Sequence, residues 1–238
     1  MRYYFERIAA NESSLPMAKA ARLVQDLVDL CSEQKTHFLG LTTCKSDYDY
    51  LAHHSVNTCV ISLVFGAELG LDKKQLHELG MSALFSQLGS ATLPRSILER
   101  PGGLTPSERE LVDVLPLRTV KTILALRGMD QTTMARMIAA YESRVDYALP
   151  SRRRDGSIEL TRPKLGLGPH GRIIAIAECF DALTSRRPFR EAYGPQVALA
   201  LMASEIEYRF DPDLLRVFMK VMAIQPIKIV GRARIAPF

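Results

Sequence analysis

The chain has 238 residues, 47% of them hydrophobic, and a net charge of +5, values that suit one large globular unit with its own core. It has no tryptophan, and its other aromatic residues do not alternate with basic ones, which argues against a nucleic-acid reader that stacks bases. The modest basic charge is compatible with solubility alone or with an anionic partner such as a phosphate.

Three further sequence features bear on the compartment. No run of about 20 apolar residues is present, so we expect no membrane span. The N-terminal stretch MRYYFERIAANESS lacks the apolar core of a signal peptide. The four cysteines, Cys31, Cys44, Cys59 and Cys179, show no C-x-x-C spacing, and most of them lie in apolar helical patterns. These features predict a cytoplasmic protein in a reducing compartment.

The first strong periodic pattern predicts an amphipathic helix over residues 16–34, where leucines and valines recur every three or four positions. The next helix is predicted over residues 49–69. Its interior, VNTCVISLVFGAEL, is apolar nearly all round, which is typical of a central, buried helix. Gly70 is predicted to end it.

A third helix is predicted to begin at Asp72, a residue that caps helix N-termini, and to end at Gly89. Thr105, Pro106 and Glu108 form a T-P-x-E start signal for a further helix, because the threonine and the glutamate form a capping box and proline fits the first helical position.

The rest of the chain reads as more helices and one irregular segment. Helices are predicted over residues 117–126, 131–143, 171–184, 195–208 and 211–222. Residues 147–169, rich in Arg, Gly and Pro, are predicted to be a long loop, and the tail 225–238 has a short β-like alternation. We predict an all-α bundle of about eight or nine helices with a short β-like C-terminal extension. The expected organisation is an N-terminal helix and connecting loop (1–45), a helical domain (46–222) and the extension (223–238).

Four separated segments resemble, in the right order, the HD-GYP family of the HD phosphohydrolase superfamily. They are the His54-Ser55 pair in its helix, the stretch LGMSALFSQLGSATLPRSILERPGGLTPSERELV, the motif FDALTSRRPFR, and Phe210-Asp211-Pro212. The likeness covers roughly residues 20–222 and implies an HD-domain-like helical fold. Active members of this family cleave the phosphodiester bonds of cyclic di-GMP with two or three metal ions, which activate a water and clamp the reacting oxygens.

The family's metal-ligand positions are largely altered in this sequence. The resemblance places the following residues at them: His54, Ser86, Gln87, Leu115, Ala140, Tyr141 and Glu178. Only His54 and Glu178 retain clear ligand chemistry, with Glu142 and Asp49 as weaker candidates, whereas a two-ion site needs about six good ligands. The sequence therefore predicts no metal, no other cofactor, no catalytic residue, and a protein that is not an enzyme.

The altered positions carry structural expectations of their own. His54 is predicted to be a buried histidine bonded to a neighbour, and Ser86 and Gln87 to form hydrogen bonds across the pocket to His54, Tyr141 or Glu178. Glu178 and Asp181 lie three apart on one helix face. For Asp181 the favoured interpretation is structural, with Thr184 and Ser185 bonding back to the helix end.

Two arginine clusters leave two interpretations open, a solvated surface or contacts to the phosphates of a nucleotide. They comprise Arg152, Arg153, Arg154, Arg186, Arg187 and Arg190.

The leading hypothesis for function is a catalytically inactive HD-GYP-like module that binds a protein partner in bacterial signalling. The alternatives are a cyclic dinucleotide receptor without hydrolysis and a metal-dependent cyclic di-GMP phosphodiesterase with an atypical site. Expected partners are an unidentified protein, a second copy of the chain in a homodimer, or a cyclic dinucleotide, with neither nucleic acid nor membrane.

Overall fold

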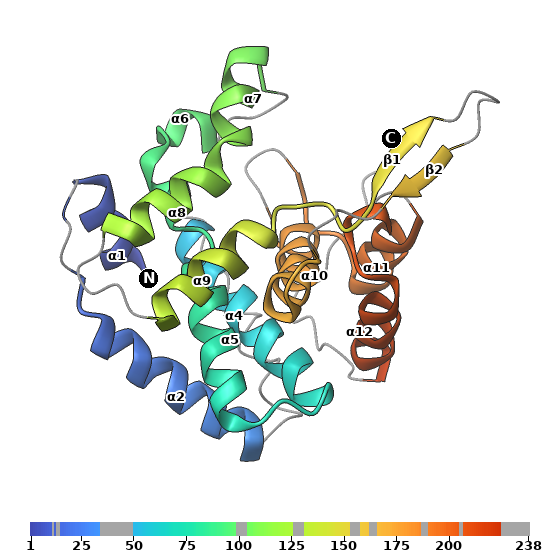
Figure 1. Cartoon of the computed structure of the whole chain (residues 1–238), viewed down its shortest axis with the longest axis horizontal. Coiled ribbons are helices and arrows are strands. Elements are labelled where there is room, and N and C mark those ends of the chain that lie inside the picture. The colour runs from blue at the N-terminus through green and yellow to red at the C-terminus, as the bar shows by residue number, and fades with distance from the viewer. Residues whose placement is uncertain are drawn as a thin grey trace.

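The computed structural model describes residues 1–10, 12, 15–33, 50–98, 104–125, 131–152, 158–161, 166–186, 190–204 and 207–224. Within these ranges the chain forms eleven α-helices, two short 3-10 helices and one two-stranded hairpin (Figure 1). The all-α prediction is confirmed. Among the described helices, none combines the length and the apolarity that a bilayer crossing requires.

The elements, in chain order, are α1 (Arg2–Ala9), α2 (Met17–Glu33), α4 (Tyr50–Glu68), α5 (Lys73–Phe85), η2 (Leu88–Thr92), α6 (Arg95–Leu98), α7 (Pro106–Asp113), α8 (Leu115–Ala125), α9 (Gln131–Glu142), β1 (Leu149–Arg152), β2 (Ile158–Thr161), α10 (Pro169–Thr184), α11 (Pro195–Ser204), η3 (Glu207–Arg209) and α12 (Pro212–Ile224). The predicted helix number is lower than the observed one because α1 and α6, of eight and four residues, are too short to show a clear 3.6-residue period.

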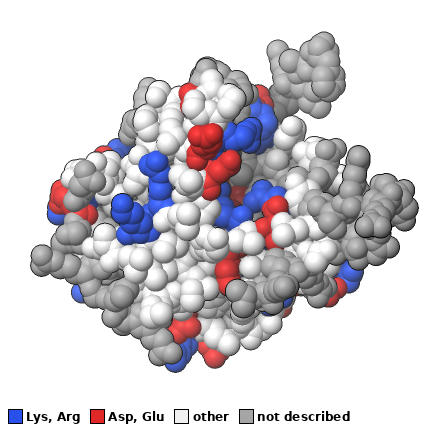
Figure 2. Space-filling model, turned by 45° about the horizontal axis from the view of Figure 1, so that its top comes forward, with Lys and Arg blue, Asp and Glu red and all other residues white. Residues whose placement is uncertain are grey.

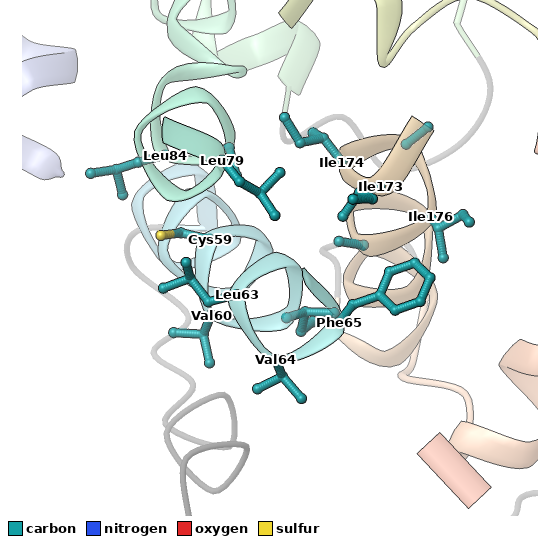
Figure 3. Packing of buried hydrophobic residues seen from close by; sticks show 14 of the residues in the cluster. Cys59, Val60, Leu63, Val64, Phe65, Leu79, Leu84, Ile173, Ile174 and Ile176 are labelled. Atoms are coloured by element: carbon teal, nitrogen blue, oxygen red, sulfur yellow. The ribbon is translucent and has the colours of Figure 1, made fainter. Parts of the chain in front are cut away.

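Helix α4 forms the centre of the bundle, as its apolar sequence predicts. It packs against α5 on one side and α10 on the other, and Figure 3 shows its apolar side chains between those of the two neighbours. Phe65 and Leu63 of α4, Leu79 of α5 and Ile174 of α10 are all essentially inaccessible to solvent. Burying side chains of this size contributes about 1.5–3 kcal/mol each.

The N-terminal helices pack on the same core. Tyr4 and Phe5 of α1 and Val24 and Val28 of α2 belong to one continuous cluster with α4 and α5, and α2 contacts both of these helices. The boundary predicted at residue 45 lies outside the described residues.

Helix ends follow the capping signals of the sequence. Gly70 ends α4 with a φ of 83°, a conformation that glycine adopts without strain. Asp72 and Thr105 each form the capping box that the sequence predicts. The third helix, in contrast, ends at Phe85 rather than at Gly89, and the chain continues through a turn into η2.

The prediction of a long loop over residues 147–169 is wrong in part. Residues 149–152 and 158–161 form an antiparallel hairpin, with Leu149 opposite Thr161. Pro150 and the dense polar residues hide the two-residue alternation that identifies a strand. The start of the hairpin is tied to η3 by two backbone hydrogen bonds, from Ala148 N–H to Tyr208 O and from Tyr147 N–H to Arg209 O. The extension was predicted over 223–238, but residues 223 and 224 form the last positions of α12, and the rest of that range lies outside the described residues.

Asp211 joins α12 to α10. Its side chain accepts hydrogen bonds from Arg172 at 2.6 Å and from the backbone N–H groups of Asp213 and Leu214 at the start of α12. Burial alone raises the pKa of this carboxyl group, but the bonds from Arg172 and the two N–H groups outweigh it and lower the pKa below its ordinary value. The ionised form therefore stabilises the fold.

Asp211→Asn is expected to lower the free energy of unfolding at pH 7 by about 1–2 kcal/mol. Because the folded-state pKa is depressed, this contribution is present above the unfolded pKa of about 4 and is lost as the pH falls through the folded value. Urea titrations from pH 7 down to pH 3 measure the effect, and the difference between variant and wild type should shrink below about pH 4. Asp213→Asn is the matched control, since that exposed side chain pairs only with Arg216 on the surface among the described residues. An equal loss in both variants would contradict the assignment.

Candidate functional site

A pocket of about 460 Å³ opens where α4, η2, α8, the end of α9, α10 and η3 meet. This volume falls within the range of small-molecule sites. The lining residues are Tyr50, Leu51, His54, Gln87, Ser90, Leu98, Leu115, Arg144, Ala175, Glu178, Cys179, Ala182, Leu183, Arg190 and Arg209. In Figure 2, basic and acidic side chains gather around a hollow near the middle of the visible face.

Glu178 of α10 is the centre of a buried polar network at this pocket. Its Oε1 accepts hydrogen bonds from Ser86 Oγ at 2.6 Å and from Gln87 Nε2 at 2.7 Å. Its Oε2 lies 3.2 Å from Arg144 Nε, and Arg144 Nη2 also donates to Gln87 Oε1 at 2.6 Å. A buried carboxylate is stable only when donors or a cation compensate its charge, and here three side chains do so.

This network confirms one of the three partners predicted for Ser86 and Gln87. Glu178 is that partner, whereas His54 bonds elsewhere and Tyr141 lies 42% exposed on the bundle surface. Ala140 is fully buried in the core.

His54 forms a second buried network with Asp181. Nδ1 of His54 lies 2.6 Å from Asp181 Oδ2, and Asp181 Oδ1 accepts from Asn57 Nδ2 at 2.8 Å and from Ser185 Oγ at 3.1 Å. The ring of Tyr50 stacks on His54 with centroids 5.5 Å apart. The predicted bonded, buried His54 is confirmed, and so is the back-bonding of Ser185. The sequence did not indicate that Asp181 is the partner of His54, because 127 residues separate them.

Glu142, a weaker ligand candidate, has a structural task. Its carboxylate accepts the backbone N–H of Gly168 at 2.8 Å, at the N-cap of α10. It thereby fixes the end of α9 to the start of α10.

The arginines of the two predicted clusters lie in different surroundings. Arg190 lines the pocket, but it also donates to the carbonyls of Ala182 and Leu183 at the end of α10. Arg186 is exposed and pairs with Glu191. Arg152 lies in β1, its side chain is not described, and Arg153, Arg154 and Arg187 lie outside the described residues.

Two pocket arginines escaped the sequence-based prediction. Arg144 follows α9 and Arg209 ends η3, and both line the pocket. Neither belongs to a cluster or a motif, so no local signal identifies them. Only the packing of the helix ends brings them to the pocket.

Gly89 explains why a glycine follows the Ser86-Gln87 pair. Its N–H donates to Thr119 Oγ1 at 3.0 Å, and a Cβ at this position would lie 2.5 Å from the Thr119 backbone nitrogen and 2.7 Å from the Leu115 carbonyl oxygen. Backbone atoms cannot move aside as the end of a flexible side chain can. Glycine is therefore required for the close approach of α8 to the segment that carries Gln87.

Gly89→Ala is expected to lower the free energy of unfolding by about 1–3 kcal/mol through overpacking. Chemical denaturation measures the loss. Gly166→Ala is the control, since a Cβ there meets no atom within 4 Å. Unchanged stability in Gly89→Ala would show that α8 does not approach this closely.

Few of the described side chains at the pocket have the ligand chemistry that a two-ion centre requires. No group of three or more His, Cys, Asp or Glu side chains suited to hold a metal occurs among the described residues. Both oxygens of Glu178 already have partners, one of them the cation of Arg144, and Leu115 and Ala140 have no donor atom. These residues do not fit a two-ion centre, and Asp49 lies outside the described residues.

The fold is a bundle of α-helices around a polar pocket. Comparison with known proteins identifies the family to which this fold belongs. The profile of the HD domain matches residues 5–214, so the chain belongs to the HD domain family. A solved structure of an HDG"Y"P protein from Bdellovibrio bacteriovorus superposes with a TM-score of 0.67 over 87% of this chain and 63% of that chain, at 14% identity. This likeness supports the fold, and the HD-GYP resemblance of the sequence is confirmed.

Several curated relatives match nearly the whole chain. A cyclic di-GMP phosphodiesterase of Pseudomonas aeruginosa is 27% identical over 95% of this chain and 52% of its own length. A 3'3'-cGAMP-specific phosphodiesterase of Vibrio cholerae is 27% identical over 92% of this chain and 45% of its own length. The chain thus spans about half the length of these relatives.

These relatives correct two expectations. The prediction that the chain is not an enzyme is contradicted, since proteins similar to most of it are named phosphodiesterases. The prediction that no metal cofactor belongs to it is contradicted on the same ground, because phosphodiesterases of this family work with metal ions. The relatives favour the phosphodiesterase alternative over the inactive scaffold.

Proposed function

We propose that this chain binds a cyclic dinucleotide in the pocket between α4, α9 and α10 and hydrolyses one of its phosphodiester bonds. The single observation that carries the binding step is the convergence of Arg144, Arg190 and Arg209 on one pocket. The relatives named as phosphodiesterases for cyclic di-GMP and 3'3'-cGAMP support the reaction class and the substrate class.

The charge of the pocket suits such a ligand. Three guanidinium groups face one carboxylate, Glu178, among the lining residues, which leaves a formal excess of two positive charges. A cyclic dinucleotide carries one negative charge on each of its two phosphodiesters. Guanidinium groups pair with phosphate oxygens through parallel hydrogen bonds.

The three arginines are not equivalent. Arg190 uses its terminal nitrogens on backbone carbonyls at the end of α10. Arg144 is held in place by Glu178 and Gln87, so it presents a fixed positive charge. Arg209 contacts Asp146 through Nε at 3.4 Å, a contact that does not use its two terminal nitrogens. Of the three arginines, Arg209 is therefore the best placed to bind a phosphate through its terminal nitrogens.

An aromatic surface for a base is also present. Tyr50 and His54 stack with an angle of 9° between their rings, and both line the pocket. Stacking of a purine on such a ring contributes about 1–3 kcal/mol per base in other nucleotide sites.

Arg209→Gln is expected to weaken binding of cyclic di-GMP or 3'3'-cGAMP about ten- to a hundredfold, since one charged hydrogen bond contributes about 1.5–3 kcal/mol. Isothermal titration calorimetry with both ligands measures the change. Arg186→Gln is the matched control, because this arginine pairs with Glu191 outside the pocket and should leave the affinity unchanged.

Hydrolysis is tested separately from binding. Product formation from each dinucleotide is followed by chromatography, with a chelator, without addition, and with Mn²⁺ or Fe²⁺. Absence of binding to both ligands at high micromolar concentration would contradict the binding step. Binding without product under every condition would contradict the phosphodiesterase assignment.

A further inference from the structure

Glu178 is the only carboxylate among the described residues that line the pocket. Hard divalent cations such as Mg²⁺ and Mn²⁺ bind to proteins through one or two carboxylates, and water or phosphate oxygens complete their coordination. A cation of this kind that enters the pocket and binds to an acidic side chain there must therefore use Glu178. The partners of this side chain decide how readily it does so.

Both oxygens of Glu178 have partners in this structure, and one partner is a positive charge. Oε1 accepts hydrogen bonds from Ser86 and Gln87, whereas Oε2 lies 3.2 Å from Nε of Arg144. A second contact fixes the guanidinium, because its Nη2 donates to Gln87 Oε1 at 2.6 Å. Arginine stays charged at every physiological pH, so a divalent ion approaching Oε2 meets a like charge. The ion and the guanidinium therefore exclude each other at this oxygen.

Arg144 is placed so that its side chain can leave Glu178 without disturbing the core. It lies in the turn after α9, its side chain is 32% exposed, and no partner of Nη1 is found among the described residues. Its backbone is held separately, by a hydrogen bond from its N–H to Tyr141 O at 3.1 Å. A partly exposed ion pair is held weakly, because water solvates the charged group once it moves away.

We propose that Arg144 competes with a divalent metal ion for Glu178, so that an ion binds to this carboxylate only after the guanidinium has left it. The carboxylate is accessible only in the fraction of molecules in which Arg144 has moved, and this fraction lowers the apparent affinity for the ion. Arg144 thus sets the ion concentration at which the pocket is loaded. Neither a dinucleotide nor its hydrolysis is needed for this competition.

Arg144→Gln removes the positive charge and leaves Ser86 and Gln87 as donors to Glu178. The variant is expected to bind Mn²⁺ about tenfold or more tightly than the wild type, because the repulsion at Oε2 is gone. Electron paramagnetic resonance measures the free Mn²⁺ during titrations without any nucleotide. Equal affinities, or no binding to either protein at millimolar Mn²⁺, would overturn the proposal and leave the proposed dinucleotide binding untouched.

Two single variants separate competition at Glu178 from the overall charge of the pocket. Arg144→Lys keeps a positive charge beside the carboxylate and should stay within about threefold of the wild-type affinity for Mn²⁺. Arg209→Gln removes another pocket charge, whose Nε contacts Asp146 rather than Glu178, and should also leave the affinity nearly unchanged. A gain in Arg209→Gln as large as that in Arg144→Gln would show that net charge alone governs the affinity, which contradicts the competition.

A double variant identifies the carboxylate that binds the ion. Arg144→Gln combined with Glu178→Gln should lose the gain in affinity, and a gain that persists would place the ion elsewhere and overturn the proposal. Circular dichroism and thermal unfolding verify that each variant is folded. Arg144→Met, which keeps the apolar stem of the side chain, takes the place of Arg144→Gln if that variant does not fold.

The wild-type chain provides an independent readout by nuclear magnetic resonance. The Nε–H signal of Arg144 is identified as the one missing in Arg144→Lys. Addition of Mg²⁺, which is diamagnetic, should move this signal towards the position typical of a solvated arginine, because the guanidinium leaves Glu178 as the ion binds. A signal that stays in place while Mg²⁺ binds to Glu178 would show that ion and guanidinium share the carboxylate, and the competition would be refuted.

Discussion

Glu178 and Asp181 of α10 are two carboxylates buried on one helix face, and they determine which side chains must lie around the pocket. Removing one partner of a buried charge costs about 3–5 kcal/mol, so each carboxylate requires nearby donors. Asp181 obtains them from α4 and from the end of its own helix. Glu178 obtains them from the turn after α5 and from the turn after α9. These contacts join α10 to α4 and to the ends of α5 and α9.

The two carboxylates compensate their charge in different ways, and the difference shapes the chemistry of the pocket. Glu178 meets a permanent cation, Arg144, together with two neutral donors, so this end of the pocket is fixed and saturated. Asp181 meets His54, whose second ring nitrogen has no partner among the described residues. The same demand for charge compensation is thus met by a cation at one carboxylate and by an imidazole at the other.

Much of the fold follows from local sequence signals. The apolar sequence of α4 predicted a central buried helix, and the capping boxes at Asp72 and Thr105 predicted two helix starts. Short elements were missed where a few residues carry too little periodicity, as in α1, and the hairpin was missed because Pro150 interrupts the alternation of β1. At the site, the positions of Ser86 and Gln87 in one segment and of Glu178 in a later one were recognisable from the family resemblance, and so was the burial of His54.

The sequence by itself determined which residue types stand at the altered positions and that the chain folds as a helical bundle, because hydrophobic period and capping act over a few residues. Only the tertiary structure decided which side chains form hydrogen bonds and charge pairs with each other. Asp181 meets His54 across 127 positions of sequence, and Arg144 and Arg209 reach the pocket from the ends of α9 and η3. Hydrogen bonds and charge pairs depend on distances of about 3 Å, and no local pattern encodes such distances between segments that meet only when the core packs.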